Sequence, residues 1–154
     1  MEASLRTAYE ELTGFEPPSL DFTFVRGTKG IKEAVYKIGN LDISVAAVSG
    51  LANARKILNS IKNGEKNYHF IEIMACPGGC INGGGQPVVG AATRNFVDLK
   101  TLRAKGLYEL DQNKSLRKAH ENPVLKKIYE EFLEHPGSDL AHKMLHTDFV
   151  KRRR

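Results

Sequence analysis

The chain has 154 residues, of which 41% are apolar and 27% are charged, a balance typical of a globular domain and not of a disordered or fibrous one. No apolar run approaches the roughly 20 residues that a membrane helix needs, so we expect no membrane span. The net charge of +5 is concentrated in Lys151–Arg154, which leaves +1 for the rest of the chain. That is too little for a surface that tracks a phosphate backbone, and nucleic-acid binding is not expected.

The N-terminal segment is predicted to be helical. Apolar residues recur at helical spacing from Leu5 to Leu12, and the helix is expected to begin near Met1 and to end at Gly14. A loop containing two prolines follows. Phe22–Val25 is then expected to form a short strand.

The middle of the chain predicts a sheet. Two strands, Ile31–Ile38 and Leu41–Val48, flank Gly39-Asn40, whose glycine-first order is typical of a type II′ hairpin turn. A helix over Leu51–Asn63 and a strand over Tyr68–Ala75 follow, which fits a right-handed βαβ crossover with parallel strand pairing. We therefore expect an α/β fold with a mainly parallel sheet, flanking helices and a helical C-terminal tail. A ligand site is expected past the carboxyl ends of the parallel strands.

The remainder of the chain is predicted to form charged helices. Asp98–Leu110 has a helical pattern, and Asn122-Pro123 opens a second helix that runs to about Glu134. Ser138 is expected to cap a last short helix that ends near His146. These helices are predicted to cover a sheet rather than to form a separate domain.

Both cysteines of the chain, Cys76 and Cys80, lie in a loop that is rich in glycine. Glycine lets the main chain approach a ligand closely, and cysteine thiolates are ligands for iron and zinc. The loop therefore predicts a bulky inorganic group that is bound by the thiolates and faced by glycine N–H groups. The glycines of this loop are Gly78, Gly79, Gly83, Gly84 and Gly85.

Two cysteines are too few for a disulfide framework, and without a secretory segment they favour a reducing compartment, which we expect to be the cytoplasm. A flexible loop with two incidental thiols and a two-cysteine peroxide sensor are the alternatives from the residues alone. The spacing is one residue longer than in a thioredoxin-type pair, and no phosphate-binding glycine motif is present. A structural zinc or iron–sulfur site normally has four protein ligands. The two remaining ligands would come from a second copy, another polypeptide or a missing N-terminal half.

The run Phe70–Pro87, which reads FIEIMACPGGCINGGGQP, closely resembles the third cysteine motif of the iron-only ([FeFe]) hydrogenases. The likeness extends over nearly the whole chain, and its other segments are Met1–Thr7, Val25–Glu33, Arg117–Pro123 and Ala141–Thr147. The last two resemble the small-subunit-type C-terminus of that family. The resemblance implies that residues 1–110 form the second lobe of the catalytic domain and residues 111–154 a helical small-subunit-like tail.

The resemblance also implies a cofactor, the H-cluster, in which four cysteines hold a [4Fe–4S] cluster and one of them joins it to a diiron subcluster. Cys76 would ligate the cubane, Cys80 would ligate it and bridge to the diiron unit, and Met74 would pack beside that unit as an apolar wall. Further residues that would line the cofactor are Gly78, Gly79, Gly83 and Gly84.

The activity implied by the resemblance is reversible H2 oxidation and proton reduction, with ferredoxin or a similar electron carrier as partner. Ligation is incomplete in this chain, which looks cut just before Met1, so a missing N-terminal lobe or another chain would supply the other cysteines. The chain alone is expected to be inactive. The alternative is a hydrogenase-like iron–sulfur protein that binds or assembles clusters without H2 chemistry, and a third interpretation is a protein-interaction module that uses the helical tail.

Overall fold

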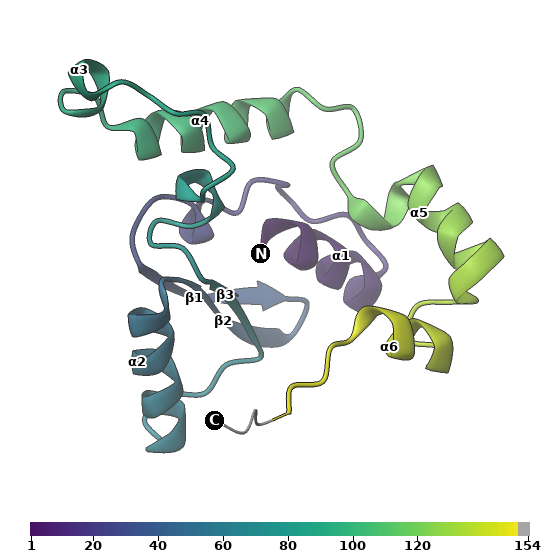
Figure 1. Cartoon of the computed structure of the whole chain (residues 1–154). Helices are drawn as coiled ribbons and strands as arrows, with labels where there is room; N and C mark the ends of the chain where they lie inside the picture. The colour runs from purple at the N-terminus through teal and green to yellow at the C-terminus, as the bar shows by residue number, and fades with distance from the viewer. Residues whose placement is uncertain (151–154) are drawn as a thin grey trace. The chain divides into compact units, whose positions relative to one another are not determined.

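The computed structural model describes residues 1–150, which divide into two compact units. The first unit is Met1–Arg117 and the second begins at Lys118 (Figure 1). The basic residues Lys151–Arg154 lie outside the described residues. Within residues 1–150, no helix combines the length and the apolar character that crossing a membrane requires.

The first unit is built on a three-stranded sheet in the order β1 (Ile31–Ile38), β2 (Leu41–Ser49), β3 (Phe70–Met74). β1 pairs with β2 antiparallel, and β2 pairs with β3 in parallel. The expected α/β class and the parallel pairing across the crossover are therefore confirmed. The sheet is mixed rather than mainly parallel, because a two-residue turn can join β1 and β2 only as an antiparallel hairpin.

The hairpin turn has the geometry that its sequence predicts. Gly39 adopts a φ of 57°, and Asn40 is not among the residues with positive φ. A type I′ turn would need positive φ at both central residues, whereas a type II′ turn needs it only at the first. The pair Gly39-Asn40 thus fits the type II′ pattern and fixes the register of the two strands, with Ile38 opposite Leu41.

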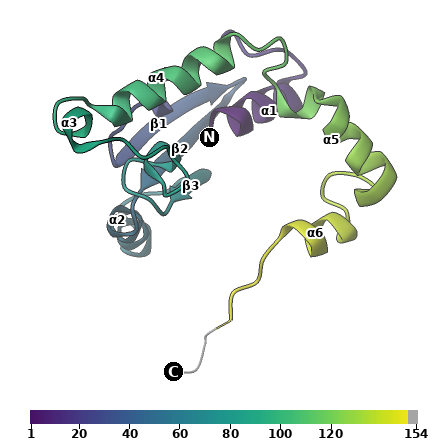
Figure 2. The same cartoon turned by 45° about the horizontal axis from the view of Figure 1, so that its top comes forward.

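Helices cover both faces of the sheet. Helix α1 (Glu2–Thr13) lies on one face and helix α2 (Leu51–Lys62) on the other (Figures 1 and 2). Alternate residues of the central strand β2 point to opposite faces, so each face has its own apolar core. The fully buried residues of the α1 face are Leu5, Phe22, Val25, Val45 and Ala47, and those of the α2 face are Ala46, Val48, Ala54 and Ile57.

The strand expected at Phe22–Val25 is wrong. The segment forms a short 3₁₀ turn, η1 (Thr23–Val25), in which the N–H of Val25 donates to the carbonyl of Phe22 at 3.1 Å. Three residues per turn place Phe22 and Val25 on the same side, and both are buried against the sheet. A strand would instead have placed Phe22 and Phe24 on one side and Val25 on the other.

The chain after β3 contains short helical pieces and one longer helix. η2 (Cys80–Asn82) and α3 (Ala91–Arg94) each make about one turn, and α4 (Leu99–Gln112) has fourteen residues. Asp98 caps α4 by accepting a hydrogen bond from the N–H of Thr101. The only fully buried residue of α4 is Ala104, so few apolar contacts hold this helix on its unit.

The second unit is helical, as the sequence predicts, although it is a compact unit of its own, which was not expected. η3 (Ala119–Glu121) precedes α5 (Pro123–Ile128), which continues as a π-helical turn, η4 (Tyr129–Leu133), and α6 (Asp139–Leu145) is the last helix. The Ser138 hydroxyl accepts from the N–H of Ala141 at 3.0 Å and donates to the carbonyl of Leu133 at 2.7 Å. Ser138 therefore caps α6 and fastens it to the preceding helix.

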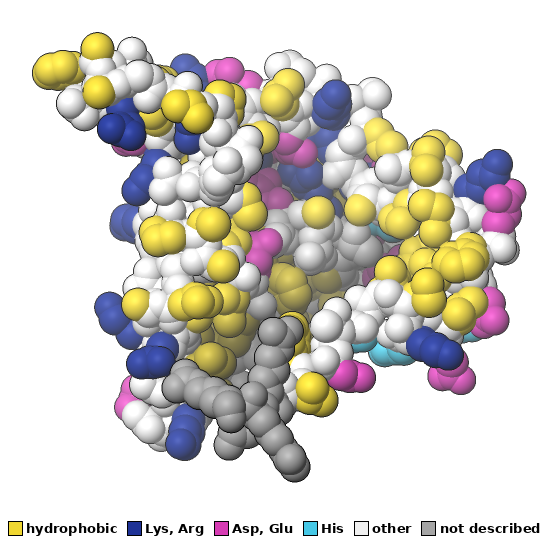
Figure 3. All heavy atoms as spheres, viewed as in Figure 1, with side chains coloured by type: hydrophobic (Ala, Val, Ile, Leu, Met, Phe, Trp, Pro, Cys, Tyr) yellow, Lys and Arg dark blue, Asp and Glu magenta, His cyan; other side chains and the backbone are white. Residues whose placement is uncertain are grey.

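Exposed large apolar side chains occur on both units. Figure 3 shows hydrophobic groups, in yellow, scattered over the visible face of the molecule. On β3, which is an edge strand of the described sheet, Phe70 is 40% and Ile73 is 44% exposed. The large side chains that are almost completely buried are few: Phe22, Ile38, Val45 and Val48.

Candidate functional site

The cysteine loop begins where the two parallel strands end together. The N–H of Gly50, directly after β2, donates to the carbonyl of Met74, the last residue of β3, at 2.8 Å. A Cβ on Gly50 would lie 3.8 Å from the Cα of Pro77, so the start of the loop passes against the end of β2. The site thus lies past the carboxyl ends of the strands, where the topology predicts it.

Two consecutive glycines turn the loop back on itself. Gly78 and Gly79 have φ values of 83° and 85°, a region that residues with a Cβ rarely adopt. The N–H of Gly79 donates to the carbonyl of Cys76 at 3.0 Å, and that of Gly83 donates to the carbonyl of Cys80 at 3.2 Å. This succession of tight turns brings the segment after Cys80 back toward Cys76.

The loop forms a cradle for the two thiols. Cys76 and Cys80 are both free, the first half-buried and the second exposed. A Cβ on Gly83 would lie 3.4 Å from the carbonyl oxygen of Cys80 and 3.7 Å from the Sγ of Cys76. Both are ordinary van der Waals separations, so the Gly83 backbone passes close to the Cys76 thiol and a Cβ there would touch the thiol without a clash. Gly84, by contrast, has open space around it.

The donors present fit part of an iron–sulfur site. Two soft thiolates and an adjacent glycine backbone suit iron, and the absence of side chains on the glycines leaves room for a group larger than a single ion. Within residues 1–150, no set of three His, Cys, Asp or Glu side chains with ligand atoms within 4.8 Å of one another includes either cysteine. The part of the chain that the structure describes therefore offers two ligands.

Met74 lies against the same loop. A Cβ on Gly79 would lie only 3.1 Å from the Sδ of Met74, so the thioether packs directly on the glycine backbone. Met74 is half-buried and is opposite Ser49 in the parallel register. Ser49 is 3% exposed, and its hydroxyl has no hydrogen-bond partner among the described residues. Met74 therefore gives the loop an apolar contact, and an unpaired hydroxyl lies on the neighbouring strand.

Two basic residues of α4 contact the loop, and neither was expected from the sequence. Arg103 donates hydrogen bonds to the carbonyls of Ile81 and Pro87, and the Cδ of Lys100 would lie 3.2 Å from a Cβ on Gly78. A basic residue on a charged helix is more often solvated, so no local signal distinguished these two from their neighbours.

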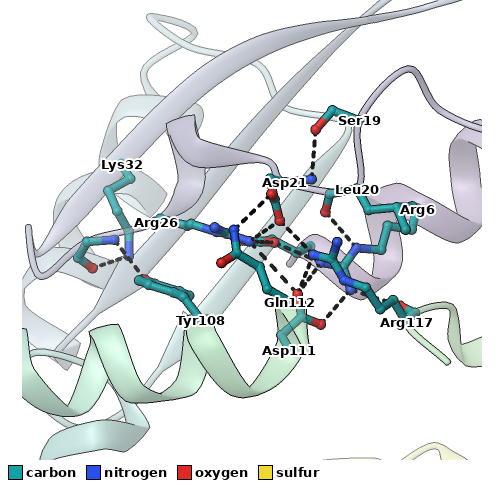
Figure 4. A network of polar contacts seen from close by, with 12 residues as sticks. Arg6, Ser19, Leu20, Asp21, Arg26, Lys32, Tyr108, Asp111, Gln112 and Arg117 are labelled. Atoms are coloured by element: carbon teal, nitrogen blue, oxygen red, sulfur yellow. Dashed lines mark hydrogen bonds and ion pairs between the residues drawn. The ribbon is translucent and has the colours of Figure 1, made fainter. Parts of the chain in front are cut away.

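A network of arginines and carboxylates joins α1, η1 and the end of α4 (Figure 4). Arg6 binds Asp111, and Arg117 bridges Asp111 and Asp21, with N–O distances of 2.6 to 2.9 Å. Arg26 pairs with Asp21 and with Glu2, and its guanidinium lies over the Tyr108 ring. The three carboxylates lie near one another, but each is paired with arginine, so the cluster is a structural one.

The arginines hold two carboxyl pKa values far below their usual range. Hydrogen bonds from Arg117, and next from Gln112, lower the pKa of Asp21 from 3.8 to about 2. The hydrogen bond from Arg6, opposed by burial and supported by Arg117, lowers the pKa of Asp111 from 3.8 to about 2. The pKa of Arg26 is raised, chiefly by its hydrogen bond to Glu2.

Comparison with known proteins divides the chain in two. The family described as "Iron only hydrogenase large subunit, C-terminal domain" matches residues 1–84, and the family described as "Iron hydrogenase small subunit" matches residues 97–152. The first match contains both cysteines, and the second contains α4 with Arg103. Together the two matches cover most of the chain.

Relatives with hydrogenase names match along the whole chain. The chain is 46% identical to the NADP-reducing hydrogenase subunit HndD of Solidesulfovibrio fructosivorans over 100% of its own length and 26% of that protein. It is 44% identical to iron hydrogenase 1 of Clostridium pasteurianum, over 98% of this chain and 26% of that one. The chain thus spans about a quarter of the length of these relatives.

A solved structure and a more distant relative complete the comparison. A variant of the [FeFe]-hydrogenase HydA1 of Chlamydomonas reinhardtii superposes with a TM-score of 0.70 at 35% identity, over 96% of this chain and 43% of that one. The cytosolic iron-sulfur assembly component 3 of Bos taurus is 31% identical over 97% of this chain and 30% of its own length. On the match over residues 1–84 and the identity with the hydrogenases, this chain belongs to the iron-only ([FeFe]) hydrogenase family.

Proposed function

We propose that the chain forms part of an [FeFe] hydrogenase, which catalyses reversible H2 oxidation and proton reduction, and that it supplies two of the four cysteine ligands of the H-cluster. The observation that carries the proposal is the packing of Met74 on Gly79 beside two free thiols, in a glycine loop at the end of parallel strands. That geometry supports a thiolate-bound group with an apolar wall in a chain of this family.

Each residue of the loop has a role in this proposal. Cys76, which is half-buried, would hold the [4Fe–4S] cluster, and the exposed Cys80 would hold it while bridging to the diiron unit. Met74 would exclude water from the side of the bridging cysteine. When bound, the H-cluster would supply the electron storage and the open iron coordination that H2 chemistry requires. The glycine backbone that would line it comprises Gly78, Gly79, Gly83 and Gly84.

The proposal requires a further lobe, in the same polypeptide or in another chain. A cubane needs four thiolates in this cluster type, and the described residues offer two. The exposed apolar residues of edge strand β3, Phe70 and Ile73, are a surface that such a lobe would cover. We divide the chain into a second catalytic lobe, residues 1–110, and a small-subunit-like tail, residues 111–154. A cytoplasmic location and a ferredoxin-like electron carrier belong to the same proposal.

The second candidate function is cluster binding or assembly without H2 chemistry. It is favoured by the 31% identity to a cytosolic iron-sulfur assembly component over nearly the whole chain. Both candidates use the two thiols as ligands of an iron–sulfur cluster. They differ in the diiron subcluster, which the hydrogenase would carry and the assembly protein would not.

One experiment separates the candidates. The chain is joined to a lobe that carries the other two cluster cysteines, matured anaerobically, and assayed for [4Fe–4S] content by electron paramagnetic resonance and for methyl-viologen-driven H2 evolution. A cubane with H2 evolution supports the hydrogenase. A cubane that takes up no diiron unit and evolves no H2, under maturation conditions that load a known [FeFe] hydrogenase, supports the assembly protein. No cubane in the joined protein, with the same result in a Cys76→Ala/Cys80→Ala control, would contradict both.

A further inference from the structure

The guanidinium of Arg103 connects two points of the chain that follow Cys80. Its Nη1 donates to the carbonyl of Ile81 at 3.2 Å, and its Nη2 donates to the carbonyl of Pro87 at 2.9 Å. Ile81 is the residue directly after Cys80, and Pro87 closes the glycine run. One side chain therefore holds both ends of the segment from Ile81 to Pro87.

Arginine is suited to this contact by its shape. Its planar fork presents two N–H groups at a fixed separation, whereas a lysine ammonium is a single point that reaches one carbonyl well. Arg103 is half-buried, and its neighbour Ala104 is 6% exposed. The helix backbone is therefore packed against the protein at the position that carries the arginine side chain. One helical turn earlier, the stem of Lys100 lies against the Gly78 position. The same face of α4 thus contacts the loop before and after Cys80.

The hydrogen bonds inside the loop lead back to Cys80. Its carbonyl accepts from the N–H of Gly83 at 3.2 Å and from the Gln86 side chain at 3.5 Å, and the N–H of Gln86 donates to the carbonyl of Gly83 at 3.1 Å. These bonds form a small folded unit, but none of them attaches it to the rest of the protein. Arg103 makes that attachment.

We propose that Arg103 is a positioning residue for Cys80, by which the small-subunit-type segment of the chain sets the path of the loop that carries the bridging thiol. Cys80 lies in the part matched by the large-subunit family, and Arg103 lies in the part matched by the small-subunit family. The segment that includes α4 is therefore a component of the site and not only an outer covering. The part of this inference that concerns the cluster rests on the proposed function. The hydrogen bonds between Arg103 and the loop are independent of it.

The contact is tested first on this chain without any metal. Arg103→Met removes both donors and keeps most of the stem, Arg103→Lys keeps the charge and one donor position, and Lys105→Met is the matched control on an exposed face of the same helix. Hydrogen–deuterium exchange follows the amides of Gly83 and Gln86. Arg103→Met is expected to speed their exchange roughly three- to tenfold, because local opening is no longer opposed by the clamp.

The other variants define the result. Arg103→Lys is expected to give intermediate exchange, and Lys105→Met is expected to match the wild type. Unchanged exchange in Arg103→Met, or an equal increase in Lys105→Met, would overturn the inference. Should Arg103→Met fail to fold by circular dichroism, Arg103→Lys is compared with Lys105→Met instead. Faster exchange in Arg103→Lys than in Lys105→Met supports the inference, and equal exchange in the two overturns it.

The role toward the cluster is tested in the protein joined to the lobe with the other cysteines, loaded with the cubane alone. The readouts are the electron paramagnetic resonance line shape of the reduced cluster and its reduction midpoint. Arg103→Met is expected to change the line shape and to make the midpoint more negative, because it removes a positive charge and frees a ligand loop. Arg103→Lys is expected to recover the midpoint more than the line shape.

Two outcomes separate this inference from the proposed function. A joined Arg103→Met protein with the wild-type line shape and midpoint would overturn the positioning of Cys80, while the proposed function would stand. A joined wild-type protein that takes up no cubane would contradict the proposed function and with it the cluster half of the inference. The exchange measurement would then still decide whether Arg103 holds the loop.

Discussion

Arg6 and Asp111, which are 105 residues apart in the sequence, form a two-pronged ion pair with N–O distances of 2.9 and 2.8 Å (Figure 4). Arg6 is 3% exposed, and it also donates to the backbone carbonyls of Leu20 and Arg117 at 2.8 Å. It lies in the part that matches the large-subunit family, and Asp111 lies in the part that matches the small-subunit family. A buried guanidinium therefore links the two parts, where α4 itself contributes little apolar burial.

Replacing Arg6 should destabilise the first unit strongly. Arg6→Ala leaves two backbone carbonyls without their donor and leaves Asp111 with Arg117 as its arginine partner. The loss of one partner of a buried pair costs about 3–5 kcal/mol, and because Arg117 remains we expect a loss at the lower end of that range. Arg6→Lys keeps the charge but not the fork, so a smaller loss is expected. Urea unfolding of the chain measures both. Lys105→Ala, which removes an exposed pair with Glu109, is the control and should change stability by less than about 0.5 kcal/mol; an equal loss there would contradict the role of Arg6.

The same network predicts loss of stability in acid. The pKa values of Asp21 and Asp111 are lowered to about 2 in the folded chain, so both carboxylates favour folding at any pH above their unfolded value near 4. This contribution is expected to disappear as the pH falls from about 4 to about 2. Because both groups are about a third exposed, each contributes roughly 1 kcal/mol and not the full value of the shift.

Urea midpoints between pH 7 and pH 2 measure this acid dependence. Asp111→Asn removes one titrating group, so the loss of stability between pH 4 and pH 2 should become shallower. Adding Asp21→Asn should have less than an additive effect, because both carboxylates bind Arg117. An unchanged acid slope in Asp111→Asn would show that the pair with Arg6 and Arg117 does not lower its pKa.

The parts of the fold that depend on local chemistry could be predicted from the sequence. A glycine at Gly14 ends the first helix in the left-handed conformation, Gly39 opens the hairpin turn, and Ser138 caps the last helix. Each of these signals acts within a few residues of itself. The parallel pairing of β2 with β3 followed from the order of elements, since a helix between two strands carries the chain back to the end of the sheet where the first strand began, so that the second strand runs in the same direction.

In the candidate site, too, the local features could be predicted from the sequence and the long-range contacts could not. Cys76, Cys80 and the glycines between them are contiguous, so their residue types alone indicated a shared chemistry. The partners of Arg103 are 22 and 16 residues away, and the partner of Arg6 is 105 residues away. One sequence carries no information on such distances, and a basic residue on a charged helix has the same pattern whether it is solvated or bound. The arginine contacts therefore came from the structure.

Gly79→Ala should disturb the site without metal. Gly79 is buried at φ 85° and ψ −171°, a region that is almost exclusive to glycine, where a Cβ costs roughly 1–3 kcal/mol. The new methyl would also lie 3.1 Å from the Sδ of Met74. We expect a loss of about 1–3 kcal/mol in urea unfolding together with a shift of the Met74 methyl signal in NMR spectra. Gly85→Ala, which meets nothing within 4 Å, is the control and should leave both unchanged. An unshifted Met74 signal in Gly79→Ala would show that the two residues are not in contact.

The two cysteines should not be equivalent in the protein joined to the lobe with the other cluster ligands. Cys80 is exposed and would be the one protein link to the diiron unit, so Cys80→Ala is expected to abolish methyl-viologen-driven H2 evolution, even if a cubane forms. Cys76→Ser keeps an oxygen ligand at a half-buried position, and a distorted cluster with reduced activity is expected. The isolated chain, with two thiolates, should evolve no H2, because a cubane held by two ligands is open to water and oxygen. Hydrogen from the isolated chain would contradict the need for a further lobe, and full activity in joined Cys80→Ala would contradict the assignment of Cys80 as the bridging ligand.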